Sequence, residues 1–209
     1  MSATCIEVAP GDVATIVTSL EMHAPPPAAT QPVRSALQLQ RWAAPVDRDR
    51  YVAVFRAIGE PWLWQGRLVV DDAALARILD ADTTEVYAAC RRDGTGVGLL
   101  ELDFAKAGEV EIAYFGLVPG MTGNGHGAWL MAHALRIGWA GGDTQRPINR
   151  AWVHTCDLDH PAALGFYQRQ GFKPFARTVE IYPDPRAIGL YPPDAAPHVP
   201  FLAVAPAST

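Results

Sequence analysis

The stretch EVEIAYFGLVPGMTGNGHGAWLMAHAL, residues 109–135, decides the fold of this chain. A strand-like apolar run breaks into a turn with four glycines in eight residues, and apolar residues then recur at helical spacing. Glycine adopts positive φ and has no Cβ, so successive backbone N–H groups can converge just before the helix. The first amides of a helix are unpaired, and its dipole favours negative charge. The stretch therefore predicts a strand, an anion-binding turn and a helix.

The spacing of this turn excludes two common phosphate-binding motifs. A P-loop needs Lys-Ser or Lys-Thr after its last glycine, and neither follows Gly127. The dinucleotide-binding fingerprint is G-x-G-x-x-G, whereas Gly123, Gly125 and Gly127 recur at every second residue. The alternative is a turn that only caps the helix. Because an unneeded glycine costs about 1 kcal/mol relative to alanine, four of them, Gly120 included, favour a bound phosphate or pyrophosphate.

The composition is that of an ordinary globular protein. The chain has 209 residues, 49% of them hydrophobic, which suits one domain spanning residues 1–209. Its net charge is −5, and no basic run is longer than Arg91-Arg92. Neither nucleic acid nor an anionic membrane is therefore an expected partner.

The sequence also bears on location and metals. The first twelve residues carry no Lys or Arg, and no long apolar run follows, so we expect no signal peptide, no membrane span and a cytoplasmic protein. The three cysteines, Cys5, Cys90 and Cys156, are far apart, which suits free thiols in a reducing compartment. The histidines show no zinc-ligand spacing, and we expect no metal.

Hydrophobic periodicity and turn residues predict the other elements. Residues 4–8 and 13–22 are expected to form a hairpin or edge strands. They belong to an N-terminal segment, residues 1–45, that also contains a proline-rich connector. A helix is expected to begin at His160-Pro161, and residues 183–209, with seven prolines, should form an irregular tail. Helices are expected at 47–58 and 71–79, and strands at 37–42, 85–91, 96–104, 110–118, 151–156 and 172–182. The helix between strands 110–118 and 151–156 implies that these two are parallel.

Two motifs in this order resemble those of the GNAT superfamily of acyl-CoA-dependent N-acyltransferases. The family's glycine signature is Gln or Arg, two residues, Gly, one residue, and Gly or Ala, and it falls on Thr122, Gly125 and Gly127. The family's late helix has an Asn, an alanine-rich turn, a Tyr and then Gly-Phe. It falls on His160, Ala162-Ala163, Tyr167 and Gly171-Phe172. The likeness runs from about residue 85 to residue 175.

The resemblance implies an α/β fold with a mixed, mostly antiparallel twisted sheet of six or seven strands and about four helices. Strands 110–118 and 151–156 would splay apart and hold the acyl-pantetheine arm of acetyl-CoA between them. The residues implied in binding this cosubstrate are Phe115, Leu117 and Val118 on the strand, Thr122, Gly123, Asn124, Gly125, His126 and Gly127 at the pyrophosphate, and His160. Thr122 replaces the family's long Gln or Arg, and His160 replaces its Asn, so binding would rest more on backbone amides.

The resemblance also implies two catalytic residues. Tyr167 matches the family's Tyr that donates a proton to the CoA sulfur, and a phenol, with a reference pKa near 10, can supply one. The alternative is that Tyr167 packs in the core with Leu164. Glu111 stands on the strand that carries the base in members resembling histone acetyltransferases, and the alternative is a solvent-facing carboxylate. Other groups that could accept the proton are Glu101, His154 and His160.

We therefore expect an N-acetyltransferase that moves an acetyl, or small acyl, group from acetyl-CoA to a primary amine by direct attack in a ternary complex. The acceptor, a small molecule or a peptide, stays open, as does a homodimer. The aromatic run Pro61-Trp62-Leu63-Trp64 would either wall the acceptor cleft or pack in the core, and an acidic protein would suit a cationic amine. The alternatives are a non-catalytic acyl-CoA-binding or regulatory module with the same fold, and a purely structural domain.

Overall fold

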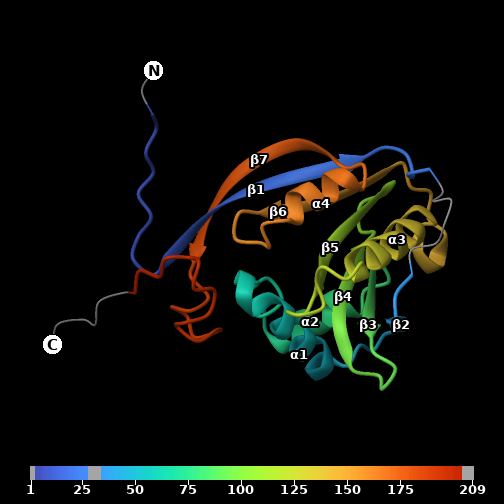
Figure 1. Cartoon of the computed structure of the whole chain (residues 1–209), viewed down its shortest axis with the longest axis horizontal. Helices are drawn as coiled ribbons and strands as arrows, with labels where there is room; N and C mark the ends of the chain where they lie inside the picture. The colour runs from blue at the N-terminus through green and yellow to red at the C-terminus, as the bar shows by residue number, and fades with distance from the viewer. Residues whose placement is uncertain (1–2, 28–33, 204–209) are drawn as a thin grey trace.

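A computed structural model describes residues 3–27 and 34–203, and one twisted seven-stranded sheet organises them (Figure 1). The strands in chain order are β1 (Asp12–Met22), β2 (Gln38–Trp42), β3 (Thr84–Cys90), β4 (Gly96–Asp103), β5 (Glu109–Leu117), β6 (Arg150–Cys156) and β7 (Lys173–Pro183). Their order across the sheet is β2-β3-β4-β5-β6-β1-β7. Only β5 and β6 pair in parallel, and the other neighbours are antiparallel. The predicted mixed sheet with one parallel pair is confirmed.

Helices cover both faces of this sheet. Those in the described chain are α1 (Arg48–Gly59), α2 (Asp72–Leu79), α3 (His126–Trp139) and α4 (Ala163–Arg169), with two short 3-10 turns, η1 (Glu60–Trp62) and η2 (Gly142–Thr144). Leu99 packs in one apolar cluster with α1 and α2, and Leu100 packs in another with α3 and Tyr167 of α4. Because consecutive strand residues point to opposite faces, α1 and α2 cover one face and α3 and α4 the other.

Local sequence explains where these helices begin. The side chains of Asp47 and Asp71 accept hydrogen bonds from the backbone N–H groups of Arg50 and Ala74, three residues further on. These are N-cap contacts, which satisfy amides that have no partner within the helix. The acidic starts predicted for both helices are therefore confirmed, and the predicted element bounds hold to within three residues from β2 to β7.

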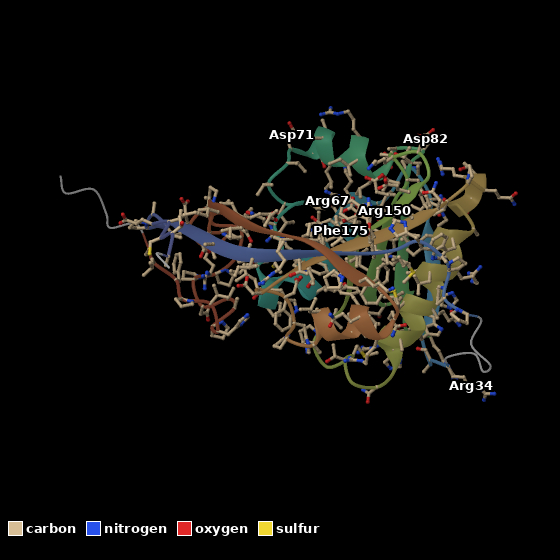
Figure 2. All side chains as sticks on the ribbon, turned by 90° about the horizontal axis from the view of Figure 1, so that it is seen from above. Arg34, Arg67, Asp71, Asp82, Arg150 and Phe175 are labelled. Carbon is tan, nitrogen blue, oxygen red and sulfur yellow. The ribbon has the colours of Figure 1, made fainter. Side chains whose placement is uncertain are left out.

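The strand predicted at residues 13–22 is confirmed by β1, but the predicted hairpin or edge arrangement of the N-terminal segment was wrong. Residues 4–8 have no regular secondary structure, and β1 lies inside the sheet, antiparallel to β6 on one side and to β7 on the other. Figure 2 shows β1 and β7 running side by side across the molecule. Leu20 of β1 is fully buried, as an inner strand requires. Residues 28–32 of the predicted connector lie outside the described residues.

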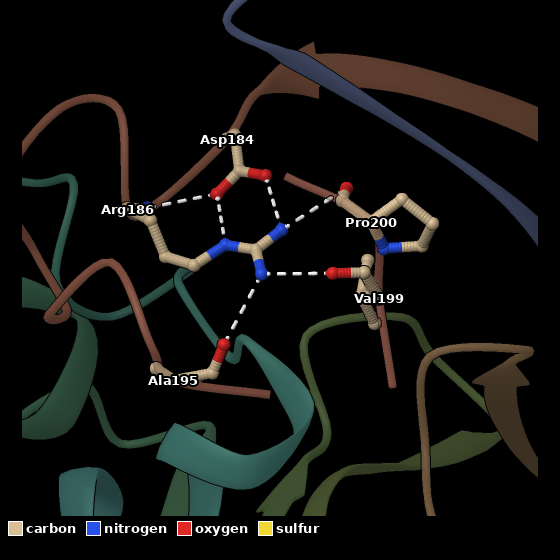
Figure 3. Close-up of polar contacts among 5 residues, drawn as sticks. All are labelled: Asp184, Arg186, Ala195, Val199 and Pro200. Carbon is tan, nitrogen blue, oxygen red and sulfur yellow. Dashed lines mark hydrogen bonds and ion pairs between the residues drawn. The ribbon is translucent and has the colours of Figure 1, made fainter. Parts of the chain in front are cut away.

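The tail after β7 has neither helix nor strand in its described part, residues 184–203, as predicted. Buried Arg186 organises it (Figure 3). The guanidinium donates to both carboxylate oxygens of Asp184 at 2.9 and 2.7 Å, and to the carbonyls of Ala195 and Val199 at 3.1 and 3.0 Å. Since a buried charge is tolerated only when it is paired and hydrogen-bonded, this network fixes the tail as part of the domain. No helix in the described chain is long and apolar enough to span a bilayer.

Candidate functional site

The parallel strands β5 and β6 form a fork. Their pairing begins at Glu109 and Arg150 and ends at Glu111 and Trp152, and in the described chain it extends no further. β5 nevertheless continues to Leu117, still paired with β4 on its other side. Backbone groups of β5 that face the fork after Glu111 therefore lack strand partners, and such groups require another hydrogen-bonding partner.

The backbone of β5 is irregular where the fork opens. Tyr114 pairs with Glu101 and Ile112 pairs with Leu102, so Ala113 has no opposite residue on β4. A bulge of this kind bends the strand and redirects its backbone groups. The opening of the fork thus coincides with a local departure of β5 from regular pairing.

The turn between β5 and α3 has the open backbone that an anion site needs. Gly120, Gly123 and Gly125 have φ values of 84°, 85° and 79°, and a Cβ at any of them would meet no described atom within 4 Å. Gly125 occupies the N-cap position of α3, and no side chain accepts a hydrogen bond from the first amides of the helix there. These amides therefore face the turn. Gly127 does not share the left-handed conformation, because it already lies in the first turn of α3.

The other residues expected at the pyrophosphate lie on the same turn. Thr122, Gly123 and Asn124 are exposed. The imidazole Nδ1 of His126 is 2.8 Å from the hydroxyl of Ser35, which precedes β2. Exposed turn amides beside a helix start can accept a phosphate group without any rearrangement of side chains.

The strand residues expected to hold the pantetheine arm divide into two kinds. Phe115 and Leu117 lie on β5 beyond the closed end of the fork. Val118 does not offer free backbone groups: its N–H donates to the carbonyl of Val97 at 2.9 Å and its carbonyl accepts from Met121 at 3.1 Å. The expected backbone role of Val118 is therefore corrected, because both of its groups are already paired.

Glu111 is the last residue of β5 that pairs with β6, and it faces the side covered by α1. Its neighbours Val110 and Ile112 pack on the α3 and α4 side, so Glu111 points to the opposite face. One carboxylate oxygen lies 3.4 Å from Nδ1 of His154 on β6. The side chains of Glu111 and His154 are 22% and 48% exposed, so the pair reaches from the fork to solvent.

Tyr167 of α4 lies on the other face of the same fork. It is 6% exposed, and its ring contacts those of Phe115, Phe166 and Phe172, with centroids 5.6 to 6.2 Å away. Burial, together with the charge of Asp159, raises the pKa of the Tyr167 phenol well above its usual value. The phenol therefore stays protonated at neutral pH.

Glu101, the alternative base, is placed differently. It is fully buried, and its carboxylate accepts hydrogen bonds from Tyr51 at 2.5 Å and from Arg67 at 2.5 and 3.2 Å. Arg67 also stacks over the ring of Tyr114 at 4.8 Å. A carboxylate that is saturated with donors and sealed from solvent is poorly placed to exchange protons with a substrate, so Glu101 serves to hold the Arg67 loop on the sheet.

The aromatic run after α1 contributes to both packing and the site. Trp64 packs with Phe55 and Tyr114 at 5.4 Å, and its indole N–H donates to Asp159 at 3.1 Å. Trp62 lies between two imidazoles, those of His160 and His198, at 5.2 and 5.6 Å. Trp64 thus packs against the core, and a place for Trp62 in the acceptor cleft stays a prediction.

His160 is not brought to the glycine turn by any contact in the described chain. Its Nδ1 accepts a hydrogen bond from the Ala162 amide at 3.1 Å. It lines a cavity of about 340 Å³ together with residues of β1, β7 and the tail. Its expected role in binding acetyl-CoA stays a prediction, and its position gives that role no contact with the glycine turn.

Sequence reasoning missed the contact that joins the site across strands and two loop residues beside it. His154 was one of several candidates, and nothing in the sequence indicated that it meets Glu111, which is 43 residues earlier. Arg67 and Asp159 gave no signal either, since each is a single charged residue in a loop. Strand pairing, which brings such residues together, is set by the whole sheet.

A family model for GNAT acetyltransferases matches residues 50–172, more than half of the chain. The chain belongs to the GNAT acetyltransferase family. The match covers α1, the fork, the glycine turn and α4, and it leaves β1 and the tail outside. No curated protein matches the chain significantly.

Solved structures with the same fold include three informative cases. A GCN5-related N-acetyltransferase from Sphaerobacter thermophilus is 17% identical over 94% of this chain and 55% of its own, with a TM-score of 0.53. A tandem GNAT protein from the clavulanic acid biosynthesis pathway is 16% identical over 80% and 53%, with a TM-score of 0.54. An aminoglycoside acetyltransferase from an uncultured soil metagenomic sample, in complex with sisomicin, is 16% identical over 65% and 87%, with a TM-score of 0.51.

These structural likenesses extend to the fold alone. The chain spans little more than half the length of the Sphaerobacter and tandem proteins. Within residues 3–27 and 34–203, no group of His, Cys, Asp and Glu side chains is arranged to hold a metal ion.

Proposed function

We propose that this GNAT protein transfers an acetyl, or small acyl, group from acetyl-CoA to a primary amine. The observation that carries the proposal is the fork, because it places a paired carboxylate on one face of the sheet and a buried phenol on the other. Family membership supports the reaction class. Direct attack in a ternary complex needs this arrangement, since the amine loses a proton while the departing sulfur gains one.

Acetyl-CoA fits the groups that the fork and the turn offer. The turn amides from Thr122 to Gly127 would hold the pyrophosphate, with Gly123 and Gly125 leaving room for it. Unpaired backbone groups of β5 between Ala113 and Leu117 would hydrogen-bond the pantetheine amides as a neighbouring strand does. These contacts orient the thioester at the fork without requiring a charged side chain.

The chain's own residues then carry two proton transfers. Glu111 accepts the proton of the acceptor amine, and the nitrogen lone pair becomes free to attack the thioester carbon. Tyr167 donates its proton, or a hydrogen bond, to the sulfur as the carbon–sulfur bond breaks. A positioned base or acid typically contributes 10²–10⁴-fold to the rate, so these residues would account for much of the acceleration.

The face around Glu111 favours a positively charged acceptor. The carboxylates of Asp159 and Glu180 lie near His154, and both help to raise the pKa of its imidazole. Trp64 and Tyr114 add aromatic surface on the same side. An acidic, aromatic-lined face attracts a cationic amine. The aminoglycoside acetyltransferase of the same fold was solved with the cationic amine sisomicin, which agrees with a small-molecule acceptor.

A non-catalytic acyl-CoA-binding module is the second candidate. One observation favours it: Thr122 stands where the family has a long Gln or Arg, so a side-chain contact to the pyrophosphate is missing. A hydrogen bond to a charged group contributes about 1.5–3 kcal/mol, so its loss weakens binding without abolishing it. Such a module would still bind acetyl-CoA but would acetylate no amine.

The test is an acetylation assay against a panel of primary amines, read by release of the CoA thiol and by the mass of the product. The panel should contain aminoglycosides, polyamines, amino acids and peptides. Thiol release that depends on one class of amine is the expected result. Binding of acetyl-CoA without turnover of any amine would establish the non-catalytic alternative, and absence of binding would refute both.

A further inference from the structure

The Glu111–His154 contact crosses the fork at the point where it opens. Glu111 is the last residue of β5 that pairs with β6, and it lies opposite Trp152. His154 follows Trp152 by two residues on β6, so it shares the same face of the sheet. The 3.4 Å contact between Glu111 Oε1 and His154 Nδ1 is thus the next link between the two strands after their backbone pairing ends.

The exposure of the two side chains increases away from the fork. Glu111 is 22% exposed, and His154 is 48% exposed with its ring beside that of Trp152 at 6.1 Å. Nδ1 of His154 faces Glu111. The other ring nitrogen, Nε2, has no hydrogen-bond partner among the residues that the structure describes. The pair therefore forms a continuous polar path from the closed end of the fork to solvent.

Carboxylates surround His154. The hydrogen bond with Glu111 raises the pKa of the imidazole, burial opposes it, and the charges of Asp159 and Glu180 raise it further. Arg150, earlier on the same strand, is occupied by Glu21 and Glu109 at 2.6 and 2.7 Å. The pKa of the His154 imidazole is therefore raised above its usual value of about 6.5.

An isolated carboxylate is a poor final acceptor for an amine proton. Ordinary carboxylates have pKa values near 4.3, several units below neutral pH, and catalysis is most efficient when the pKa of the base lies near the working pH. An imidazole in contact with the carboxylate reduces this mismatch, because the usual pKa of an imidazole lies much closer to neutral pH than that of a carboxylate.

We propose that Glu111 and His154 act as a proton relay, in which His154 receives the acceptor's proton through Glu111 and passes it to water. The proposal rests on the acetyl-transfer function proposed above. It assigns His154 a catalytic role beyond orienting Glu111, and it gives the fork an exit for protons on the side covered by α1.

The relay conserves protons and charge. The amine N–H bond breaks, its electron pair stays on nitrogen, and the proton passes by way of a Glu111 oxygen to Nδ1 of the neutral imidazole. The product is a carboxylate–imidazolium pair. The imidazolium then releases its Nε2 proton to solvent, and exchange with water returns the remaining proton from Nδ1 to Nε2. His154 must be neutral to start the cycle, so the rate should rise as pH passes through its pKa.

The first arm of the test measures the pair without activity. The imidazole Cε1 protons are followed by NMR as pH is varied in the wild type, Glu111→Gln and His154→Gln, the last of which assigns the His154 signal. We expect a pKa above about 6.5 for His154 in the wild type and a lower value in Glu111→Gln. An unchanged His154 pKa in Glu111→Gln would overturn the relay.

The second arm measures kcat/KM against pH, from about pH 6 to 9.5, with an amine that the wild type acetylates. The wild-type rate should show an inflection at the His154 pKa found by NMR and reach its plateau above it. His154→Gln should lose that inflection and fall roughly tenfold to a hundredfold at pH 7, with the KM for acetyl-CoA within about twofold. Added imidazole should restore part of the rate of His154→Ala, which a purely structural role would not allow.

His23 supplies a matched control. It contacts Glu21 at 3.2 Å, the same kind of pair, but beyond the end of β1 and away from the fork. His23→Gln should keep the wild-type rate and pH profile. A His154→Gln variant within threefold of wild type at pH 7, with the same inflection, would refute the relay. A wild type that acetylates no amine would refute the proposed function and the relay with it, and that failure appears before any variant is compared.

Discussion

The two faces of the sheet at the fork have opposite surroundings. On the α1 side, Glu111 and His154 are polar, paired and open to solvent. On the α4 side, Tyr167 is buried among phenylalanines, and burial keeps its phenol protonated. A base must pass its proton to water, whereas an acid must keep its proton until the leaving group needs it. The difference indicates that a forked sheet can supply a base from one face and an acid from the other.

The largest expected effect comes from removing the proton acceptor on the open face. Glu111→Gln keeps the shape of the side chain but cannot accept a proton, so turnover should fall roughly 10²–10⁴-fold with binding of acetyl-CoA retained. Steady-state rates from neutral to alkaline pH test this, and part of the loss should be recovered as pH rises. A variant within threefold of wild type would transfer the role to His154 alone or to water.

A second variant distinguishes the roles of Glu111 and Glu101, the two carboxylates on that same face. Glu101 is buried against Tyr51 and Arg67, so Glu101→Gln leaves the partly buried guanidinium of Arg67 without its counter-charge. Breaking a buried pair in this way costs about 3–5 kcal/mol of stability. Denaturant unfolding should show this loss, while turnover per folded molecule changes little at a temperature where the variant is folded. The opposite outcome, normal stability with lost turnover, would make Glu101 the base.

The glycine turn can be tested separately from both faces. A ligand at a hundred times its dissociation constant adds about 2.7 kcal/mol, or roughly 5–10 °C for a domain of this size, so acetyl-CoA should raise the melting temperature. Gly125→Asp should abolish the shift, because a carboxylate would repel the pyrophosphate. Gly94→Asp is the matched control, since Gly94 also has positive φ in open space but lies in the β3–β4 turn. A Gly125→Asp protein that folds and still shows the shift would place the anion site elsewhere.

The smallest expected effect belongs to the buried face. Tyr167→Phe removes one oxygen and keeps the ring, so turnover should fall about tenfold or more while acetyl-CoA binds nearly as before. Tyr87→Phe is a control, because Tyr87 is also buried but bonds Glu85 away from the fork. If both variants lose stability alike and neither loses turnover, Tyr167 only packs in the core.

Much of the fold follows from short-range sequence signals. Apolar spacing, the acids Asp47 and Asp71, and the glycines before α3 predict the elements from β2 to β7, because each signal acts within a few residues. β1 could not be placed in this way. Its partner residues on β6 and β7 are at least 129 residues away in the chain, and its alternating pattern suits an edge or an inner strand equally well.

The site was predictable to a similar extent. The turn residues were predicted because glycine spacing has a direct conformational meaning, and Glu111 and Tyr167 were predicted from the resemblance to the family, and their roles stay predictions. The Glu111–His154 contact could not be predicted, because it depends on the register of two strands. The backbone pairing of Val118 and the position of His160 against Trp62 were likewise consequences of packing that the local sequence does not encode.

The division of acid and base between the two faces can be measured directly by changing the leaving group. Acetyl transfer by the wild type, Tyr167→Phe and Glu111→Gln should be compared with acetyl-CoA and with an acetyl donor whose thiol has a lower pKa. Such a thiol needs no proton when it leaves, so the second donor should restore much of the rate of Tyr167→Phe and little of that of Glu111→Gln. Equal recovery in both variants, or in neither, would contradict the assignment of the acid to the buried face and the base to the open one.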